Sequence, residues 1–427
     1  MPHLGLLCPE LTGHLNPLTT LGRELQRRGH TITVISRPDG ERKARAAGLG
    51  FSPIGEKDFP VGSMARTSAE LGRLRGLAAI RFTAEMLRQS AAIVLRDAPA
   101  AVSAAKVDAM LVDQVAPAGY TVAEELGLPY VTVCNALALN SDPDVPPGVM
   151  PWKFRRGFFA RLRNQFGHAV LRWLARPLVG EINNHRQKHG LRALRRGLDE
   201  GSRLAQIAQQ PAFFDYPRRS LPECFHYTGP WHDAHSGGTI PFPWEKLDGR
   251  PLIYASMGTL QNRLHTIFGT IAEACEGLPA QLVLSLGSAD QKLDMKFAGD
   301  PIVVPFAPQL ELLKRAALSI THAGLNTALE SLGHGVPMVA IPITNDQPAV
   351  ASRLEWLGVA EVVPLAKLSA PRVRAAVERV LREPSYREKA REFQQTIAKT
   401  EGVQRAADLV EQAFSTREPV LRSAFGR

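Results

Sequence analysis

Short apolar runs rich in β-branched residues alternate with longer stretches of helical spacing in the first half of the chain. The apolar runs predict strands at 4–8, 30–36, 108–113 and 130–134. The intervening stretches predict helices at 16–28, 68–97 and 117–126. Buried strands that alternate with helices are typical of a parallel sheet with crossover helices. The Pro-rich stretch 141–151 predicts a loop, and a long basic helical segment follows it.

The second half repeats this pattern after a stretch rich in glycine and proline. Five strand-like runs lie at 251–258, 281–287, 302–306, 318–322 and 337–343, and residues 371–415 read as helical. We therefore expect an α/β protein with two Rossmann-like, doubly wound parallel-sheet domains that face a cleft. The expected boundaries are 1–230 for the first domain, 231–249 for a linker and 250–400 for the second domain. Residues 401–427 form a C-terminal helix and tail that could cross back to the first domain.

Ligands of such sheets bind beyond the carboxyl ends of the strands, so the strand ends hold the candidate chemistry. His322 ends one strand, and a helix begins shortly after Gly324. The free N–H groups and the positive dipole end of a helix bind anions, and Asn326 and Thr327 lie in its first turn. Glu330 lies one turn further on, where its carboxylate can accept the hydroxyls of a ribose. A capped helix with a glycine turn would explain these residues equally well.

Three more strand ends of the second domain carry groups that suit a nucleotide sugar. The first is a small turn with Ser256, Gly258 and Thr259. The second offers the aromatic ring of Phe306 and the amide of Gln309, with Ala307 between them. The third offers Asp346 and Gln347. Each is weak evidence alone. Four strand ends of this kind in one domain make chance a poor explanation.

This ordered set resembles the donor-site signature of family 1 UDP-glycosyltransferases, which share the GT-B fold. The resemblance covers the whole chain in layout and is specific over residues 306–348, and the bacterial zeaxanthin glucosyltransferases and related natural-product enzymes are the most similar group. It implies that Phe306 stacks on uracil, that Ala307 and Gln309 fix its edge, and that Glu330 holds the ribose. It further implies diphosphate contacts from His322, Asn326, Thr327, Ser256 and Thr259, and sugar contacts from Asp346 and Gln347.

Two positions depart from the plant members of this family, which usually have Trp where this chain has Phe306 and Leu325. The uracil platform is therefore smaller. The pair Asn326 and Thr327 favours a UDP-sugar, with glucose preferred. A dTDP-sugar-dependent enzyme of the macrolide type remains an alternative.

The catalytic base is expected in the first domain. His14 follows the first strand and precedes a helix with Pro17 in its first turn, and Asp113 ends another strand. Inverting transfer needs a base near neutral pH, which an imidazole oriented by a carboxylate supplies. In the family this His and Asp form that dyad. The structural alternatives are a helix-entry histidine and a strand-end cap.

No metal, cofactor or disulfide is predicted. Asp142 and Asp144 form a D-x-D pattern only inside the Pro-rich loop, and the four cysteines form no C-x-x-C pair. Transfer is therefore expected to be independent of metal ions. The chain lacks a secretory signal and an apolar stretch of about 18 residues, so a cytoplasmic protein is expected.

The net charge of +10 is concentrated in residues 151–196, which hold 12 Lys and Arg and one acid. Within them, aromatic and aliphatic residues recur at helical spacing. Three interpretations remain open: an anchor on an anionic membrane, a wall of the pocket for a lipophilic acceptor, or a solvated face over an ordinary core. Nucleic-acid binding is not indicated because no binding motif accompanies the charge.

Other classes of function fit the sequence less well. A cell-wall transferase would have a Gly-rich first loop, and an NAD enzyme would have G-x-G-x-x-G. A nucleotide-sugar epimerase would have no use for His14 and Asp113. A non-catalytic, donor-binding auxiliary protein remains the alternative from another class.

Overall fold

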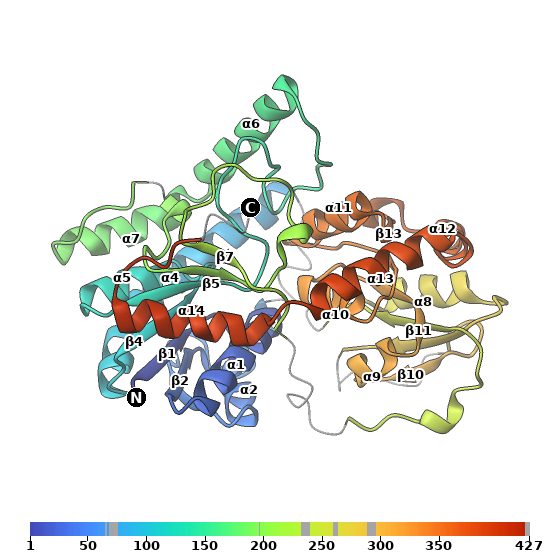
Figure 1. Ribbon diagram of the computed structural model, residues 1–427, viewed down its shortest axis with the longest axis horizontal. Helices are drawn as coiled ribbons and strands as arrows, with labels where there is room; N and C mark the ends of the chain where they lie inside the picture. Colours follow the sequence, from blue (N-terminus) through green and yellow to red (C-terminus); the bar gives the residue numbers. More distant parts are fainter. Residues whose placement is uncertain are drawn as a thin grey trace. The chain divides into compact units, whose positions relative to one another are not determined.

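Two compact units make up the protein, and each contains an open parallel sheet (Figure 1). The computed structural model describes residues 1–64, 66–67, 76–195, 197–231, 240–258, 264–287 and 296–422. The first unit comprises Met1–Pro147, Arg155–Asp233 and Glu401–Arg427. The second comprises Gly148–Phe154 and Ala234–Thr400. The two α/β domains expected from the sequence are thus present.

The first unit contains a seven-stranded sheet in the order β3-β2-β1-β4-β5-β6-β7, with every neighbouring pair parallel. Its strands are β1 His3–Leu7, β2 Thr31–Ser36, β3 Gly50–Pro53, β4 Ala109–Asp113, β5 Tyr130–Cys134, β6 Gln206–Ala208 and β7 Phe225–Tyr227. The chain builds outward from β1 to one edge and then returns to place β4 on the other side of β1. This reversal between β1 and β4 is a topological switch point.

Helices cover both faces of this sheet. They are α1 Thr12–Arg27, α2 Glu41–Ala46, α4 Gly76–Ala104, α5 Ala118–Glu125, α6 Phe158–Leu174, α7 Arg176–Lys188 and α14 Gly402–Thr416. Successive strand residues point to opposite faces. Leu4 and Leu6 accordingly pack in one core with α1 and α14, whereas Leu7 and Val112 pack in another with α4, α5 and α7.

The second unit contains a six-stranded parallel sheet in the order β10-β9-β8-β11-β12-β13. Its strands are β8 Leu252–Ser256, β9 Gln281–Ser285, β10 Ile302–Val304, β11 Ala316–Thr321, β12 Met338–Ala340 and β13 Ala360–Val362. Its helices are α8 Leu264–Cys275, α9 Gln309–Leu313, α10 Leu325–Gly333, α11 Gln347–Leu357, α12 Ala370–Arg382 and α13 Pro384–Ala398. The switch point lies between β8 and β11. All five strands predicted for this half are confirmed.

Short 3-10 turns complete the described elements: Pro38–Gly40, Gly197–Asp199, Ala212–Phe214, Trp244–Lys246 and Leu365–Lys367. The four cysteines are buried and free. Among the helices of the described residues, none combines the length and the apolar character needed to cross a bilayer.

The last helix packs on the first unit. In α14, Leu409 and Val410 enter the core behind β1. Arg28, the C-cap of α1, contacts Glu411 at 2.7 Å, and His30 contacts the same carboxylate at 3.0 Å. Gly402 is required at the start of this helix, because a Cβ there would lie 2.4 Å from the carbonyl oxygen of Pro230.

Candidate active site

One candidate site lies at the switch point of the first sheet. The chain leaves β1 and enters α1, which places His14 beyond the carboxyl end of β1, while Asp113 is the last residue of the neighbouring strand β4. The imidazole Nδ1 of His14 lies 2.7 Å from Oδ2 of Asp113. The structure therefore brings together two residues that are 99 positions apart in the sequence.

Asp113 is fully buried, and its carboxylate is held by further donors. Its Oδ2 also accepts a hydrogen bond from Nδ2 of Asn135 at 2.7 Å, and its Oδ1 accepts one from the backbone N–H of Val115 at 3.0 Å. These bonds compensate for burying a carboxylate and fix its direction. When Nδ1–H of His14 donates to this carboxylate, the lone pair of the neutral imidazole is on Nε2. His14 remains 15% exposed. The pair can act as an oriented general base.

Helix α1 begins earlier than we predicted, and Asp113 has a partner that we did not predict. We expected His14 to precede a helix with Pro17 in its first turn, but α1 begins at Thr12, so His14 lies in the first turn and Pro17 lies inside the helix. Asn135 was missed, although it directly follows β5 and is therefore another strand-end residue.

The second candidate site lies at the switch point of the second sheet, where Ser256 at the end of β8 pairs in register with the last residue of β11. His322 follows β11, and its ring fits between two glycines. A Cβ at Gly258 would lie 2.8 Å from Nε2 of His322, and a Cβ at Gly324 would lie 2.5 Å from the same atom. Burial lowers the pKa of His322 to about 4, against a hydrogen bond with the backbone of Ser256 that raises it. The imidazole is therefore neutral at physiological pH.

Ala323 and Gly324 form the turn after His322. The positive φ angle belongs to the buried Ala323, at 61°, whereas Gly324 has a φ of −63°. Gly324 is needed to leave space for the imidazole. It is also the N-cap of α10 and offers no side-chain cap to the first turn. The backbone N–H groups of that turn, with Asn326 and Thr327, suit an anion.

Glu330 and Gln309 contact each other in the same region. Nε2 of Gln309 donates to Oε2 of Glu330 and lies 3.5 Å from the hydroxyl oxygen of Thr327. Oε1 of Gln309 accepts from the hydroxyl of Tyr254 at 3.0 Å. Burial raises the pKa of Glu330 to about 7, although the bond from Gln309 opposes the shift. Tyr254 lies inside β8 and was not predicted as a site residue.

The remaining predicted donor residues lie on loops after β10 and β12. Phe306 is 42% exposed, so its ring can be stacked upon, and Ala307 is buried. Asp346 is partly buried and precedes α11. Oε1 of Gln347 accepts the backbone N–H groups of residues 343 and 344 at 2.9 and 3.0 Å, so this oxygen already holds the loop. Thr259 lies outside the described residues.

The D-x-D pair has a structural role. The carboxylate of the buried Asp142 accepts backbone N–H groups from Asp144 at 2.8 Å, Arg219 at 2.7 Å and Ser220 at 2.9 Å. These bonds tie the Pro-rich loop to the segment that precedes β7. Both oxygens of the Asp142 carboxylate thus accept backbone hydrogen bonds.

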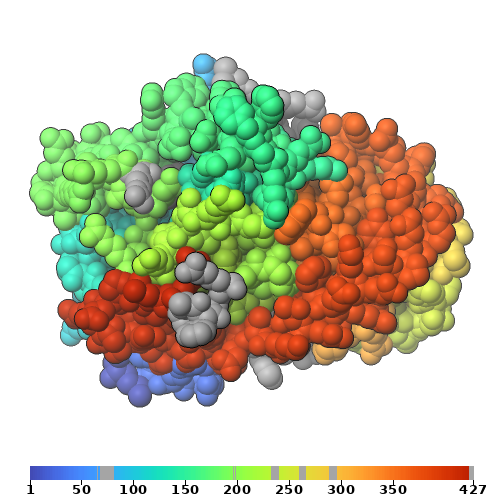
Figure 2. All heavy atoms as spheres, turned by 45° about the horizontal axis from the view of Figure 1, so that its top comes forward, coloured from blue at the N-terminus to red at the C-terminus, as the bar shows by residue number. Residues whose placement is uncertain are grey.

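Helix α6 has its apolar side outward. Its exposed large apolar residues are Phe158 at 74%, Phe159 at 82%, Leu162 at 55%, Phe166 at 67% and Trp173 at 60%. Its buried residues are Asn164, Gly167 and His168. Figure 2 shows the green atoms of this part of the chain at the surface. The interpretation as a solvated face over an ordinary core is therefore wrong for this helix.

The polar inner side of α6 explains its orientation. Nδ2 of Asn164 donates to the carbonyl oxygen of Pro143 at 3.1 Å. Nε2 of His168 lies 3.1 Å from the carbonyl oxygen of Asp142 and 3.0 Å from that of Val145. Burial lowers the pKa of His168, so it remains neutral and can donate to these carbonyls. Hydrogen bonds to the loop, rather than the aromatic residues, attach the helix.

Comparison with known proteins identifies the family. Residues 202–403 match the family described as UDP-glucoronosyl and UDP-glucosyl transferase. The chain is 33% identical over 424 residues to a zeaxanthin glucosyltransferase of Pantoea ananas, an alignment that covers 99% of this chain and 98% of that protein. The chain belongs to this family of glycosyltransferases. A zeaxanthin glucosyltransferase of Pseudescherichia vulneris is 32% identical over 98% of this chain and 100% of its own length.

The solved structures agree on the fold of this glycosyltransferase. The crystal structure of CalG4, the calicheamicin glycosyltransferase, matches with a TM-score of 0.75 and 22% identity, covering 98% of this chain and 100% of that one. The two parallel-sheet units are those of the GT-B fold. The family resemblance drawn from the strand ends of the sequence is therefore confirmed, and the protein is an enzyme.

Proposed function

We propose that this glycosyltransferase moves a sugar, with glucose favoured, from a UDP-sugar to a hydroxyl group of a lipophilic small molecule, with inversion at the anomeric carbon. The observation that carries the proposal is the hydrogen bond between His14 and the buried Asp113. Two relatives named as zeaxanthin glucosyltransferases support a carotenoid or another lipophilic natural product as the acceptor.

The proposed step needs one base and one leaving-group site. Nε2 of His14 takes the proton of the acceptor hydroxyl as its oxygen attacks the anomeric carbon. The bond from that carbon to the diphosphate oxygen breaks, the electron pair goes to that oxygen, and UDP leaves. Asp113 stabilises the imidazolium that forms. The proton ends on the imidazole, and the new bond is the C–O glycosidic bond between the anomeric carbon and the acceptor oxygen.

The proposed donor contacts follow from the second sheet. The N-terminus of α10 and the neutral His322, acting as an N–H donor, bind the diphosphate. Glu330 accepts the ribose hydroxyls, and Phe306 stacks on the base. Asp346 and Nε2 of Gln347 contact the sugar. Because the groups that bind the diphosphate are a helix N-terminus and an uncharged donor, we propose that transfer needs no metal ion. We expect EDTA to leave most of the activity intact.

The first test is thermal unfolding with UDP, dTDP, GDP and ADP in turn, with EDTA present. A ligand that binds only the folded protein raises its stability by about 2.7 kcal/mol at 100 times its Kd. A shift with UDP supports the donor assignment. A shift with dTDP alone would move the donor to deoxysugars, and no shift with any nucleotide would refute the donor site.

The second test separates catalysis from donor binding. In His14→Ala, transfer from UDP-glucose to zeaxanthin or a comparable lipophilic alcohol should be lost, while UDP binding by calorimetry stays as in the parent. Retained transfer would refute the base assignment. If the parent binds UDP but glycosylates no lipophilic alcohol, the auxiliary-protein alternative takes precedence.

We also propose that the outward face of α6 contacts an anionic membrane, from which the acceptor is taken. Residues 155–180 contain six arginines and no acid, and the aromatic side chains lie exposed between them. Apolar residues flanked by arginine bind the interface of anionic bilayers through burial and electrostatic attraction together. This contact would place the enzyme at the inner surface of the cell membrane.

Vesicle flotation tests this contact. The parent should float with vesicles that contain phosphatidylglycerol and much less with pure phosphatidylcholine, and Phe159→Ser with Phe166→Ser should reduce flotation. Leu365→Ser is the matched control, because that exposed leucine lies in the second unit. Equal flotation of the double variant and the control, or no flotation of the parent, would refute the membrane contact.

A further inference from the structure

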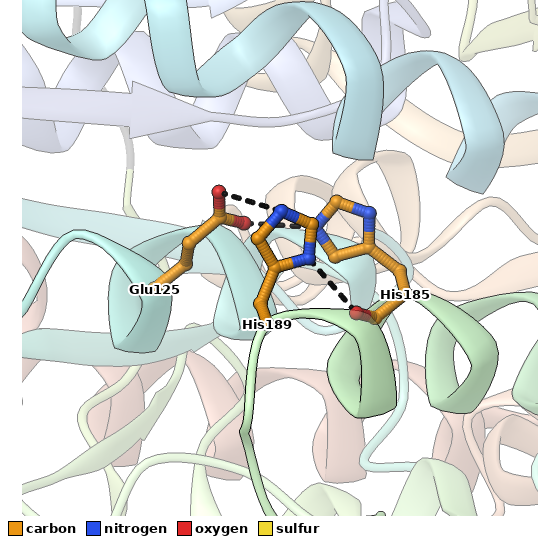
Figure 3. Close-up of side chains that lie close together, drawn as sticks. All are labelled: Glu125, His185 and His189. Carbon is orange, nitrogen blue, oxygen red and sulfur yellow. Dashed lines mark hydrogen bonds and ion pairs between the residues drawn. The ribbon is translucent and has the colours of Figure 1, made fainter.

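Two histidines and one glutamate form a cluster away from both candidate sites. Glu125 is the last residue of α5, His185 lies in the last turn of α7, and His189 is the C-cap of that helix. Nε2 of His185 lies 2.8 Å from Oε2 of Glu125, and Nε2 of His189 lies 3.6 Å from Oε1 of the same carboxylate. Figure 3 shows the two rings stacked beside the carboxylate, with centroids 4.0 Å apart.

The geometry resembles a prepared set of metal ligands. One atom of each residue, an imidazole nitrogen or a carboxylate oxygen, lies within 4.8 Å of the others. Two histidines four positions apart lie on one side of a helix and can therefore hold the same ion. A third ligand from another helix completes the set of two nitrogens and one oxygen that binds zinc in proteins.

The Nδ1 nitrogen of His189 already makes a hydrogen bond. Its Nδ1 lies 2.9 Å from the carbonyl oxygen of His185, which can only accept, so Nδ1 carries the proton. The lone pair is therefore on Nε2, the atom that faces Glu125 (Figure 3). Such a hydrogen bond on the far ring nitrogen fixes the tautomer and direction of metal-binding histidines.

The cluster is accessible to an ion and to water. The side chains of His185, Glu125 and His189 are 19%, 20% and 40% exposed. The nearby Arg186 is occupied elsewhere, because its guanidinium contacts Glu124 at 2.6 Å and the hydroxyl of Thr121 at 3.0 Å. Water can therefore supply a fourth ligand.

We propose that Glu125, His185 and His189 bind one borderline-soft divalent ion, Zn²⁺ in particular, which ties the C-terminal end of α5 to that of α7. Helix α5 starts shortly after Asp113 at the carboxyl edge of the first sheet and runs back toward the amino edge. Glu125 at its far end thus lies at the opposite edge from the His14 pair. The ion does not take part in transfer, so the site is compatible with metal-independent chemistry.

The test is a titration of the chelator-treated, full-length protein with Co²⁺, whose visible absorption reports tetrahedral coordination, followed by calorimetry with Zn²⁺. His189→Gln changes an exposed side chain and should weaken binding about tenfold or more, and Glu125→Gln should act in the same direction. The control is His30→Gln, which removes a histidine that pairs with one carboxylate, Glu411.

The parent should also melt at a higher temperature with Zn²⁺ than with Mg²⁺, and His189→Gln should lose this difference. Circular dichroism shows whether each variant is folded. The same affinity in His189→Gln as in the parent would overturn the proposal, because the ion would then be bound elsewhere. No binding, or an equal response to Mg²⁺, would also overturn it. These measurements contain no nucleotide, so their outcome is independent of the proposed transfer activity.

Discussion

Replacing Glu330 by glutamine should make the protein more stable at alkaline pH and a poorer binder of UDP. Burial raises the pKa of this carboxyl group from 4.5 to about 7 in the folded protein. The folded pKa lies above the unfolded one, so stability is highest at low pH and is lost as the pH rises through the folded pKa. Glu330→Gln carries no charge and should lack this loss.

The expected magnitude follows from the two pKa values. The difference between 4.5 and about 7 corresponds to about 3 kcal/mol in the free energy of unfolding, of which about 2.5 kcal/mol develops between about pH 5 and pH 8.5. In a domain of this size, about 1 kcal/mol moves the melting temperature by about 2–4 °C. The variant should therefore melt about 6–12 °C above the parent at about pH 8.5, where the whole difference is present, with a much smaller difference near pH 5.

Melting curves at half-unit pH steps measure this gain. The control is Glu311→Gln on α9, an exposed carboxylate whose pKa is lowered by Lys314, which should show no gain at high pH. A stability difference for Glu330→Gln that is equal at low and high pH would refute the reasoning from burial.

Calorimetry with UDP measures the functional half of the prediction. A hydrogen bond to a charged acceptor contributes about 1–2 kcal/mol more than one to a neutral acceptor, so the affinity of Glu330→Gln for UDP should fall about 5–30-fold at alkaline pH. In the parent, UDP binding near neutral pH should release a proton, because the ribose favours the ionised carboxylate. Unchanged affinity in the variant would remove Glu330 from the ribose site.

Three further substitutions test the candidate sites. Asp113→Asn turns an amide toward the imidazole and disfavours the required tautomer, so kcat should fall about 10²–10⁴-fold with UDP affinity unchanged; a loss below tenfold would contradict the dyad. Asn135→Ala removes one donor to that carboxylate, and denaturant unfolding should show a loss of about 1–3 kcal/mol; no loss would mean the bond is unimportant. Gly258→Ala combines a φ of 77° with a Cβ 2.8 Å from His322, so UDP affinity and melting temperature should both fall. The control is Gly277→Ala, which has a φ of 71° and no neighbour within 4 Å and should lower the melting temperature alone. Equal UDP affinities in the two variants would refute the role of the His322 imidazole in binding UDP.

The long elements of the fold could be predicted because each repeats its pattern several times. Strands of five or six residues, such as β1 and β11, and helices such as α12 follow directly from apolar spacing. Strands β10 and β12 have only three residues but lie within longer apolar runs, so they were predicted. Strands β3, β6, β7 and β13 were missed because they are short and no such run marks them. The assignment of Gly148–Phe154 to the second unit was also not predictable. In this unit, Phe154 contacts Trp356 of α11, with ring centroids 5.9 Å apart.

The site residues that the sequence identified stand at strand ends or in the helices that begin there, where topology alone makes residues distant in sequence neighbours. His14 and Asp113 could be paired because His14 follows β1 and Asp113 ends β4, and these two strands flank a switch point. Tyr254 could not be found, because inside a strand it looks like any buried aromatic residue. The cluster of Glu125, His185 and His189 was missed although the two histidines are four apart, since the third ligand comes from another helix.

The return of α14 to the first unit affects the order in which the protein is completed during synthesis. The second unit has all its residues once Thr400 has left the ribosome, whereas the first still lacks Glu401–Arg427. Until then, the face of the first sheet that holds Leu4, Leu6 and Ile32 lacks the partners Leu409 and Val410. The part of the chain made first is thus finished last, which reverses the usual vectorial order of domain folding. A nascent chain stalled just before α14 would expose an apolar surface that chaperones bind.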